Sequence, residues 1–261
     1  MGRGMVGSQG AMEDLVKAGK LKRVDVLLVH AKRSLIGWII RFGLKSYWNH
    51  VALVYVIRDA DHGYDNTFII ESAAHGVDIH NIDCYLARPK KFDVAIKRLE
   101  APWFANDGQG LEIRRRVRGY ALNEIDAAYD YELFVRVGQM ILGRWILGWL
   151  SYLWEGIFRR DRRRVSVTRV TPHKYVCSGF AQLAYFQAVR DCGVHPLDLW
   201  QMVVHPDFDP EHPDEDLLRT TTPEDFSQSE HFRWKYLIKD GKVYTFGEDI
   251  FKPPKYRWSD F

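Results

Sequence analysis

The chain has 261 residues, of which 46% are hydrophobic and 27% are charged, and its formal net charge is +3. This length and composition suit one large domain with a substantial core, and the small net charge gives no reason to expect a nucleic-acid partner. The three cysteines, Cys84, Cys177 and Cys192, are an odd number, which argues against a disulfide framework. We therefore expect free thiols and a reducing, cytoplasmic location.

The first 20 residues are rich in Gly and Ser and lack the apolar core of a secretion signal. We expect a flexible leader over 1–20, with one short helix over 12–18. The rest of the chain, 21–261, is expected to form a single domain.

Five segments within the first hundred residues have the pattern of β-strands. The apolar, β-branched run 24–30 predicts a buried strand, and the segment 34–48 that follows has helical spacing. Residues 49–59 alternate, with His50 and Ala52 on the same face. The remaining strands are expected at 66–72, 77–82 and 92–100.

Residues 101–170 differ in character, and we expect a mostly helical, partly apolar insertion. Its first part, 112–134, is charged and helical, whereas 133–158 is apolar over most of a helix circumference and precedes an arginine cluster at 159–164. Arg144 near mid-bilayer would cost roughly 2.5–3.5 kcal/mol, so a simple transmembrane span is not expected.

Two interpretations of this insertion remain open. It is either a helix pair packed into the domain, or a platform that meets a membrane surface or an acylated substrate. In the second case the lipid contacts would come from Trp145, Trp149, Trp154, Arg159 and Arg160.

The C-terminal third supplies further helices and a hairpin, so the predicted class is α+β. Apolar positions recur at helical spacing after Cys177, and Thr222-Pro223 has the pattern of a helix N-cap followed by the first helical residue. Asp240-Gly241 lies between two alternating segments in 234–246, which predicts a β-hairpin.

Cys177 is the candidate nucleophile, in the stretch KYVCSGFA over 174–181. A cysteine in the first turn of a helix lies beside unpaired backbone N–H groups and the positive end of the dipole, which favours the thiolate. Ser178 and Gly179 are small, so the sulfur would be reachable and their backbone could donate to an oxyanion. The alternative is a buried structural thiol.

A thiolate nucleophile needs a base, and the base needs a partner that fixes its tautomer. His50 begins a predicted strand and Glu71 ends another. If these strands are antiparallel neighbours, the two side chains come close to lateral register. Taken singly, each residue also fits an ordinary solvated strand end.

The order of VDVLLVH, NHVALVYV, IIESAAHGV and YVCSGFAQLAY resembles the circularly permuted branch of the NlpC-type papain-like cysteine peptidases. That branch includes YiiX- and YaeF-like proteins and, more distantly, the lecithin–retinol acyltransferase group. The resemblance covers about 24–100 and 173–240. It implies a permuted papain-like fold whose antiparallel sheet packs on the cysteine helix, with Cys177 as nucleophile, His50 as base and Glu71 as the residue that orients the base.

We therefore expect a cysteine hydrolase, an amidase, peptidase or esterase, that acts through a thioester acyl-enzyme on a peptide, amide or acyl-lipid substrate. Two alternatives remain: a thiol acyltransferase, and a non-catalytic module that binds a membrane or a partner. No cofactor is expected. The pairs His195-Pro196, His205-Pro206 and His212-Pro213 match no tetrahedral ligand spacing, so no metal is expected either.

Overall fold

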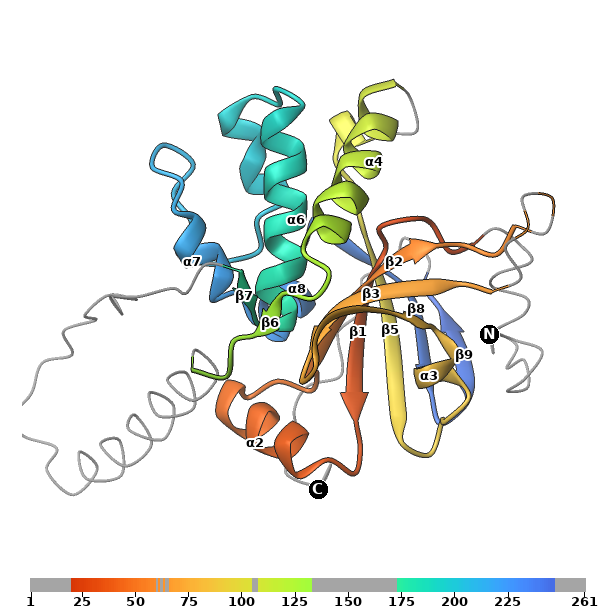
Figure 1. Ribbon diagram of the computed structural model, residues 1–261. Coiled ribbons are helices and arrows are strands. Elements are labelled where there is room, and N and C mark those ends of the chain that lie inside the picture. The colour runs from red at the N-terminus through yellow and green to blue at the C-terminus, as the bar shows by residue number, and fades with distance from the viewer. Residues whose placement is uncertain are drawn as a thin grey trace, which may run out of the picture.

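The fold is built on a seven-stranded antiparallel sheet with the strand order β4-β3-β2-β1-β5-β8-β9 (Figure 1). The computed structural model describes residues 20–59, 61, 63, 66–104, 108–132 and 173–246. A short parallel pair, β6 and β7, forms a second, two-stranded sheet that contacts β3 and β4. The strands are β1 (Val26–Ala31), β2 (His50–Val56), β3 (Phe68–Ala73), β4 (Gly76–Asn81), β5 (Phe92–Leu99), β6 (Ala128–Tyr129), β7 (Lys174–Tyr175), β8 (Phe232–Lys239) and β9 (Lys242–Thr245).

Two long helices, α4 and α6, lie side by side and pack on the sheet (Figure 1). With the antiparallel sheet they make the chain an α+β protein, as the sequence predicts. The helices are α2 (Leu35–Leu44), α3 (Asp83–Leu86), α4 (Gly108–Asn123), α6 (Cys177–Asp191), α7 (Glu215–Arg219) and α8 (Pro223–Gln228), with 3₁₀ turns η2 (Pro102–Phe104) and η3 (Pro196–Gln201).

Each face of the sheet buries its own apolar cluster, as strict alternation along the strands requires. The larger cluster joins Leu28 and Val51 of the sheet to Val117 of α4 and Tyr185 of α6. The smaller one lies on the opposite face and includes Ala52. Part of the range expected as an insertion, 101–123, therefore belongs to the main core.

Most local predictions from the sequence are confirmed. The five expected strands are β1 to β5, and the expected hairpin is β8–β9, whose turn residues Asp240 and Gly241 both have positive φ. The Thr222 side chain accepts from the Asp225 backbone N–H, and the Asp225 carboxylate accepts from that of Thr222, which completes a capping box.

Two predicted helices end earlier than expected. The helix predicted over 34–48 stops at Leu44, because Lys45 adopts the left-handed conformation with φ 50°. The helix predicted over 112–134 stops at Asn123, since the chain then turns and pairs with β4. The Val77 backbone N–H donates to the Ala127 carbonyl at 2.9 Å. The same carbonyl oxygen lies close to Gly76, where a Cβ would be only 2.5 Å from it.

Several predictions fall outside the described residues. These are the leader except for its last residue, the short helix over 12–18, and the candidate lipid contacts Trp145, Trp149, Trp154, Arg159 and Arg160. In the part of the chain that the structure describes, no helix is long and apolar enough to cross a membrane.

Candidate active site

His50 is held at the first position of β2 by the neighbouring strand. It pairs with Val29 of β1, and the preceding residue, Asn49, is fixed on both sides. The Asn49 backbone N–H donates to the Val29 carbonyl at 3.0 Å, and its side-chain Oδ1 accepts from the Ala31 N–H at 2.7 Å. The imidazole therefore starts from a rigid backbone.

Glu71 lies beside His50 on the adjacent strand, β3. One step along the ladder from the pair Leu53 and Ile70, Ala52 lies opposite Glu71, so His50 is a diagonal neighbour on the same face. The imidazole Nε2 and the carboxylate Oε2 are 2.7 Å apart. The side-by-side placement expected from the hairpin is confirmed, and Glu71 is only 3% exposed.

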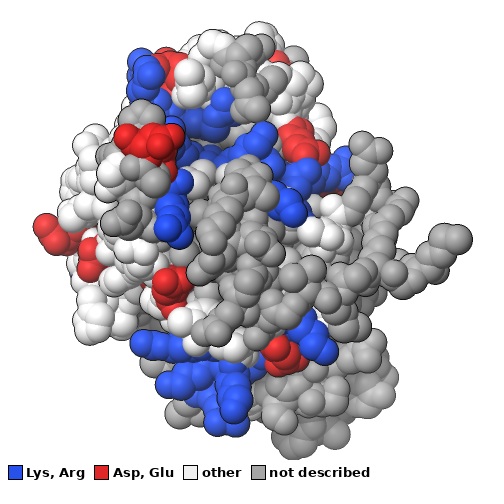
Figure 2. Space-filling view, turned by 90° about the vertical axis from the view of Figure 1, so that its right-hand side faces the viewer, with Lys and Arg blue, Asp and Glu red and all other residues white. Residues whose placement is uncertain are grey.

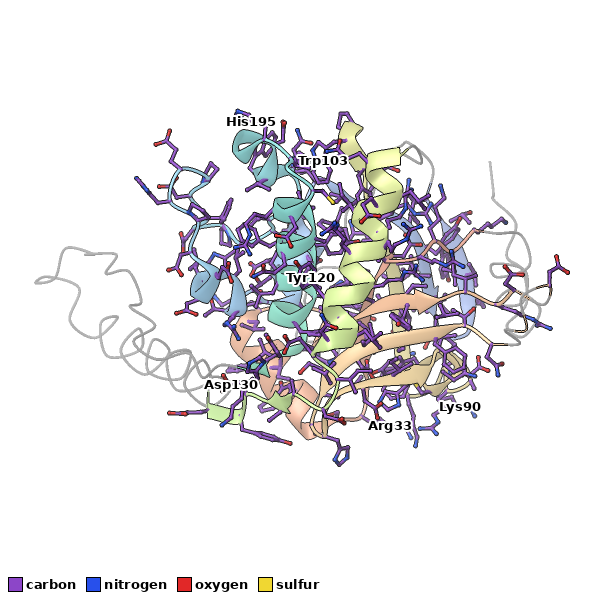
Figure 3. The ribbon with its side chains drawn as sticks, turned by 45° about the horizontal axis from the view of Figure 1, so that its top comes forward. Arg33, Lys90, Trp103, Tyr120, Asp130 and His195 are labelled. Atoms are coloured by element: carbon purple, nitrogen blue, oxygen red, sulfur yellow. The ribbon has the colours of Figure 1, made fainter. Side chains whose placement is uncertain are left out.

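Cys177 opens α6, with Val176 as its N-cap in extended conformation. The segment before it is tied to the strands, because Ser72 of β3 donates from its hydroxyl to the Tyr175 carbonyl at 2.9 Å. The Asp130 backbone N–H donates to the same carbonyl at 3.1 Å. Figure 3 shows Asp130 at this end of α6, opposite the end that carries His195.

The thiol of Cys177 and the imidazole of His50 share a hydrogen bond. Burial raises the pKa of Cys177, but the charge and hydrogen bond of His50 outweigh burial and lower it, helped by the backbone N–H groups of Val51 and Ser178. Burial likewise lowers the pKa of His50, but Cys177 and then Glu71 raise it well above its ordinary value. The arrangement favours a thiolate–imidazolium pair.

This pairing also assigns the ring nitrogens of His50. Because Nε2 contacts Glu71, Nδ1 is left for the sulfur. A carboxylate and a thiolate are both acceptors, so a doubly protonated imidazolium can donate to each of them. Glu71 thus fixes the ring orientation that the sulfur requires.

The carboxylate of Glu71 has a second donor that the sequence did not reveal. The Tyr85 hydroxyl, from the short helix α3, donates to Oε2 at 2.7 Å. Burial raises the pKa of Glu71, yet His50, Tyr85 and the nearby His80 together lower it. Burial and the neighbouring Glu71 raise the pKa of Tyr85, so its hydroxyl stays a donor.

Tyr129 also borders the site. Burial raises its pKa, and the charge of Cys177 raises it further, which places the phenol near the sulfur. The sequence predicts a helix at this residue, as part of 112–134. It lies instead in β6, which pairs with the segment directly before Cys177.

The two small residues after Cys177 face a neighbouring segment. The Ser178 hydroxyl donates to the Thr221 carbonyl at 2.6 Å, while its backbone N–H lies at the sulfur. A Cβ on Gly179 would overlap the carbonyl oxygen of Arg219. The small residues at 178 and 179 therefore allow α6 to approach the last residue of α7 and the chain directly after it.

The histidine–proline pairs are not gathered into a site. His205 contacts the Thr220 hydroxyl at 3.1 Å. Among the described residues, no group of three or more His, Cys, Asp or Glu side chains is placed to hold a metal ion.

Comparison of the chain with protein-family models and with curated proteins gives no match.

Proposed function

We propose that this protein is a cysteine hydrolase that cleaves an amide or ester bond through a thioester acyl-enzyme. One observation carries the proposal: Cys177 opens a helix and shares a hydrogen bond with His50, which in turn contacts Glu71 at 2.7 Å. Nucleophile, base and orienting carboxylate in this order are what covalent acyl transfer requires.

In the acylation step the Cys177 thiolate attacks the substrate carbonyl carbon and forms a C–S bond. The carbonyl oxygen takes the negative charge, and the backbone N–H of Ser178, in the first turn of α6 and beside the sulfur, can stabilise it. As the bond to the leaving amine or alcohol breaks, His50 gives its proton to the leaving group.

In the deacylation step a water molecule takes the place of the leaving group. Neutral His50 removes a proton from that water, which attacks the thioester carbon and displaces the sulfur. The products are a carboxylic acid and the restored thiolate–imidazolium pair. Glu71 keeps the ring in place through both steps and stabilises its charged form.

The chain order is in keeping with a circularly permuted papain-like fold. The strand with His50 comes first and the helix with Cys177 follows 127 positions later (177 minus 50). The substrate class we propose is a peptide, amide or acyl-lipid. Acyl transfer to an amine or alcohol would use the same residues up to deacylation, so the identity of the acceptor separates the two reactions.

The decisive experiment is intact-mass spectrometry after incubation with thioester-forming probes, namely activated acyl esters of short and long chains. We expect a single hydroxylamine-sensitive acyl adduct on Cys177, which disappears with time in water. The adduct should be absent from Cys177→Ala and slow to form in His50→Ala. A folded protein in which Cys177 acquires no adduct would instead be a non-catalytic binding module.

A further inference from the structure

A groove at the far end of the sheet from Cys177 is lined mainly by cations. We call it the basic groove; its volume is about 510 Å³. On the face shown in Figure 2, Lys and Arg side chains gather in the upper part, and a second group lies near the bottom. The basic residues that line the groove are Lys22, Arg23, Arg58, Arg114, Arg115 and Arg118.

Among the described residues that line the basic groove, Asp59 is the one acid beside these six cations, so these residues together carry a formal charge of +5 (6 minus 1). In the part of the chain that the structure describes, the side chains of Lys22, Arg23 and Arg58 form no ion pair. Like charges facing one groove repel one another and destabilise the fold. Such an arrangement is relieved by a bound anion.

The other cations are held in place by local contacts. Arg114 donates to the Phe104 carbonyl at 2.8 Å, and Arg115 contacts Glu112 one turn earlier at 3.0 Å. Both come from α4, which forms one wall of the groove. Leu111 of the same helix also lines the groove and is 51% exposed, which adds an apolar edge.

The backbone that presents Lys22 and Arg23 is strained and firmly fixed. Val24 has a φ of 64°, a conformation that β-branched residues rarely adopt. It is held there because its N–H donates to the Val54 carbonyl at 2.7 Å and its own carbonyl accepts from the Tyr185 hydroxyl. Strain that the surroundings enforce in this way is characteristic of ligand sites.

The basic groove is separate from the proposed active site. His50 is the first residue of β2, whereas Arg58 follows the end of the same strand. Eight residues of extended chain span about 25 Å, so a ligand in the groove does not reach Cys177.

We propose that the basic groove binds a small organic anion or headgroup that carries two or more phosphate groups. The guanidinium group matches phosphate oxygens in a bidentate way, and five of the six cations are arginines. A single phosphate would leave most of the groove and most of its charge unused, whereas small-ligand sites commonly occupy 300–1,000 Å³ by general survey, roughly the size seen here.

The test compares the 261-residue protein with two variants that each lose two positive charges. Arg23→Ser/Arg58→Ser removes from the basic groove two cations that form no ion pair with any described residue. Lys90→Ser/Lys91→Ser is the matched control, because both lysines are exposed and Lys90 lies far from Trp103 and the start of α4 (Figure 3). Circular dichroism melts establish that all three proteins are folded.

Binding is measured by calorimetry with inorganic tripolyphosphate at 150 mM salt, and by co-sedimentation with phosphatidylcholine vesicles with or without phosphatidylinositol 4,5-bisphosphate. We expect saturable tripolyphosphate binding that weakens roughly tenfold or more in Arg23→Ser/Arg58→Ser, since each lost guanidinium removes charge-assisted hydrogen bonds. The lysine control should stay within about twofold of wild type.

The outcomes answer two questions: whether the basic groove binds phosphate groups at all, and whether these belong to a free ligand or to a lipid headgroup. Tripolyphosphate binding alone supports a free polyphosphorylated ligand, and additional, bisphosphate-dependent sedimentation supports a lipid headgroup. Equal weakening in both variants would reveal general charge attraction, and would overturn the proposal. No saturable binding of either probe would overturn it as well.

Discussion

The hydroxyl of Tyr85 donates to Oε2 of Glu71 at 2.7 Å, and His50 contacts that same oxygen at 2.7 Å. Tyr85 therefore positions the proposed base indirectly, through the carboxylate. Because its hydrogen bond favours the charged carboxylate, it helps to lower the pKa of Glu71.

Tyr85→Phe should raise the pKa of Glu71 and so shift the acid limb of Cys177 alkylation to higher pH. When Glu71 is protonated at a higher pH, the imidazolium of His50 loses its negative partner at that pH. The charged form of His50, and with it the Cys177 thiolate, is then less favoured. A net hydrogen bond of about 1 kcal/mol shifts a pKa by less than one unit, so Glu71 stays ionised at neutral pH and we expect labelling to slow, roughly threefold to tenfold, on the acid side of the profile. The measurement is the iodoacetamide rate against pH. Tyr244→Phe, a change on the exposed strand β9, is the control, and superimposable profiles for the two variants would contradict the role.

The three cysteines should separate clearly in their reactivity. Burial raises the pKa of Cys84 to about 11 and also raises that of Cys192, whereas that of Cys177 is lowered through His50. Since the thiolate is the reactive form, Cys177 should be alkylated at pH 7 at least about tenfold faster than the other two. Peptide mass spectrometry after timed labelling measures this ranking.

The same labelling tests the pairing of Cys177 with His50. His50→Ala removes the charge that lowers the thiol pKa, so the neutral-pH advantage of Cys177 should be lost. His75→Ala is the control, since His75 is exposed in the turn between β3 and β4. Unchanged labelling of Cys177 in His50→Ala would show that the two residues do not act as a pair.

Gly179 should tolerate no side chain. A Cβ there would overlap the backbone of Arg219, the last residue of α7. Gly179→Ala should therefore push α6 away from the end of α7 and lower the free energy of unfolding by about 2–4 kcal/mol. Gly119→Ala is the matched helical control: nothing lies within 4 Å of its Cβ, and it should stabilise α4 by about 0.5–1 kcal/mol. Urea denaturation compares the two, and equal effects would refute the packing argument.

His30 should make stability depend on pH in the acid range. It is 3% exposed, burial lowers its pKa to about 4, and its Nδ1 donates to the Tyr47 carbonyl at 2.6 Å. Between pH 4 and about 6.5 the unfolded chain binds more protons at this residue than the folded chain does. The free energy of unfolding should therefore rise with pH across that window, by up to about 3 kcal/mol.

His30→Asn keeps a side-chain donor for the Tyr47 carbonyl but does not titrate. Urea denaturation at pH 4.5, 5.5 and 7 should show a flatter pH dependence for this variant than for wild type. The same change at the exposed His75 is the control. Parallel curves for wild type and His30→Asn would rule out the assignment.

Much of the fold follows from local patterns in the sequence. Alternation and short connections predict β1 to β5, and the antiparallel hairpin brings His50 beside Glu71. The helical period after Cys177 predicts α6. These features depend on near neighbours in the chain, which is why they are legible without tertiary information.

Features that depend on distant partners were not predictable in this way. Tyr85 reaches Glu71 only because α3 folds back after β4, and Tyr129 borders the site only because the chain turns at Asp126, with φ 68°, where a helix was expected. Lys97 is fully buried in β5, and its Nζ donates to three carbonyls near the end of α8, those of Phe226, Ser227 and Ser229. Nothing in the pattern of the strand reveals that partner.

The parallel pairing of β6 with β7 marks a place where the chain can change in length without moving the proposed site. The Asp130 backbone N–H donates to the Tyr175 carbonyl at 3.1 Å, so these two residues lie side by side although they are far apart in the sequence. The cost of closing a loop between such positions grows only with the logarithm of its length. A change in chain length between Glu132 and His173 therefore leaves the paired ends β6 and β7 side by side, and Cys177 keeps its place beside His50.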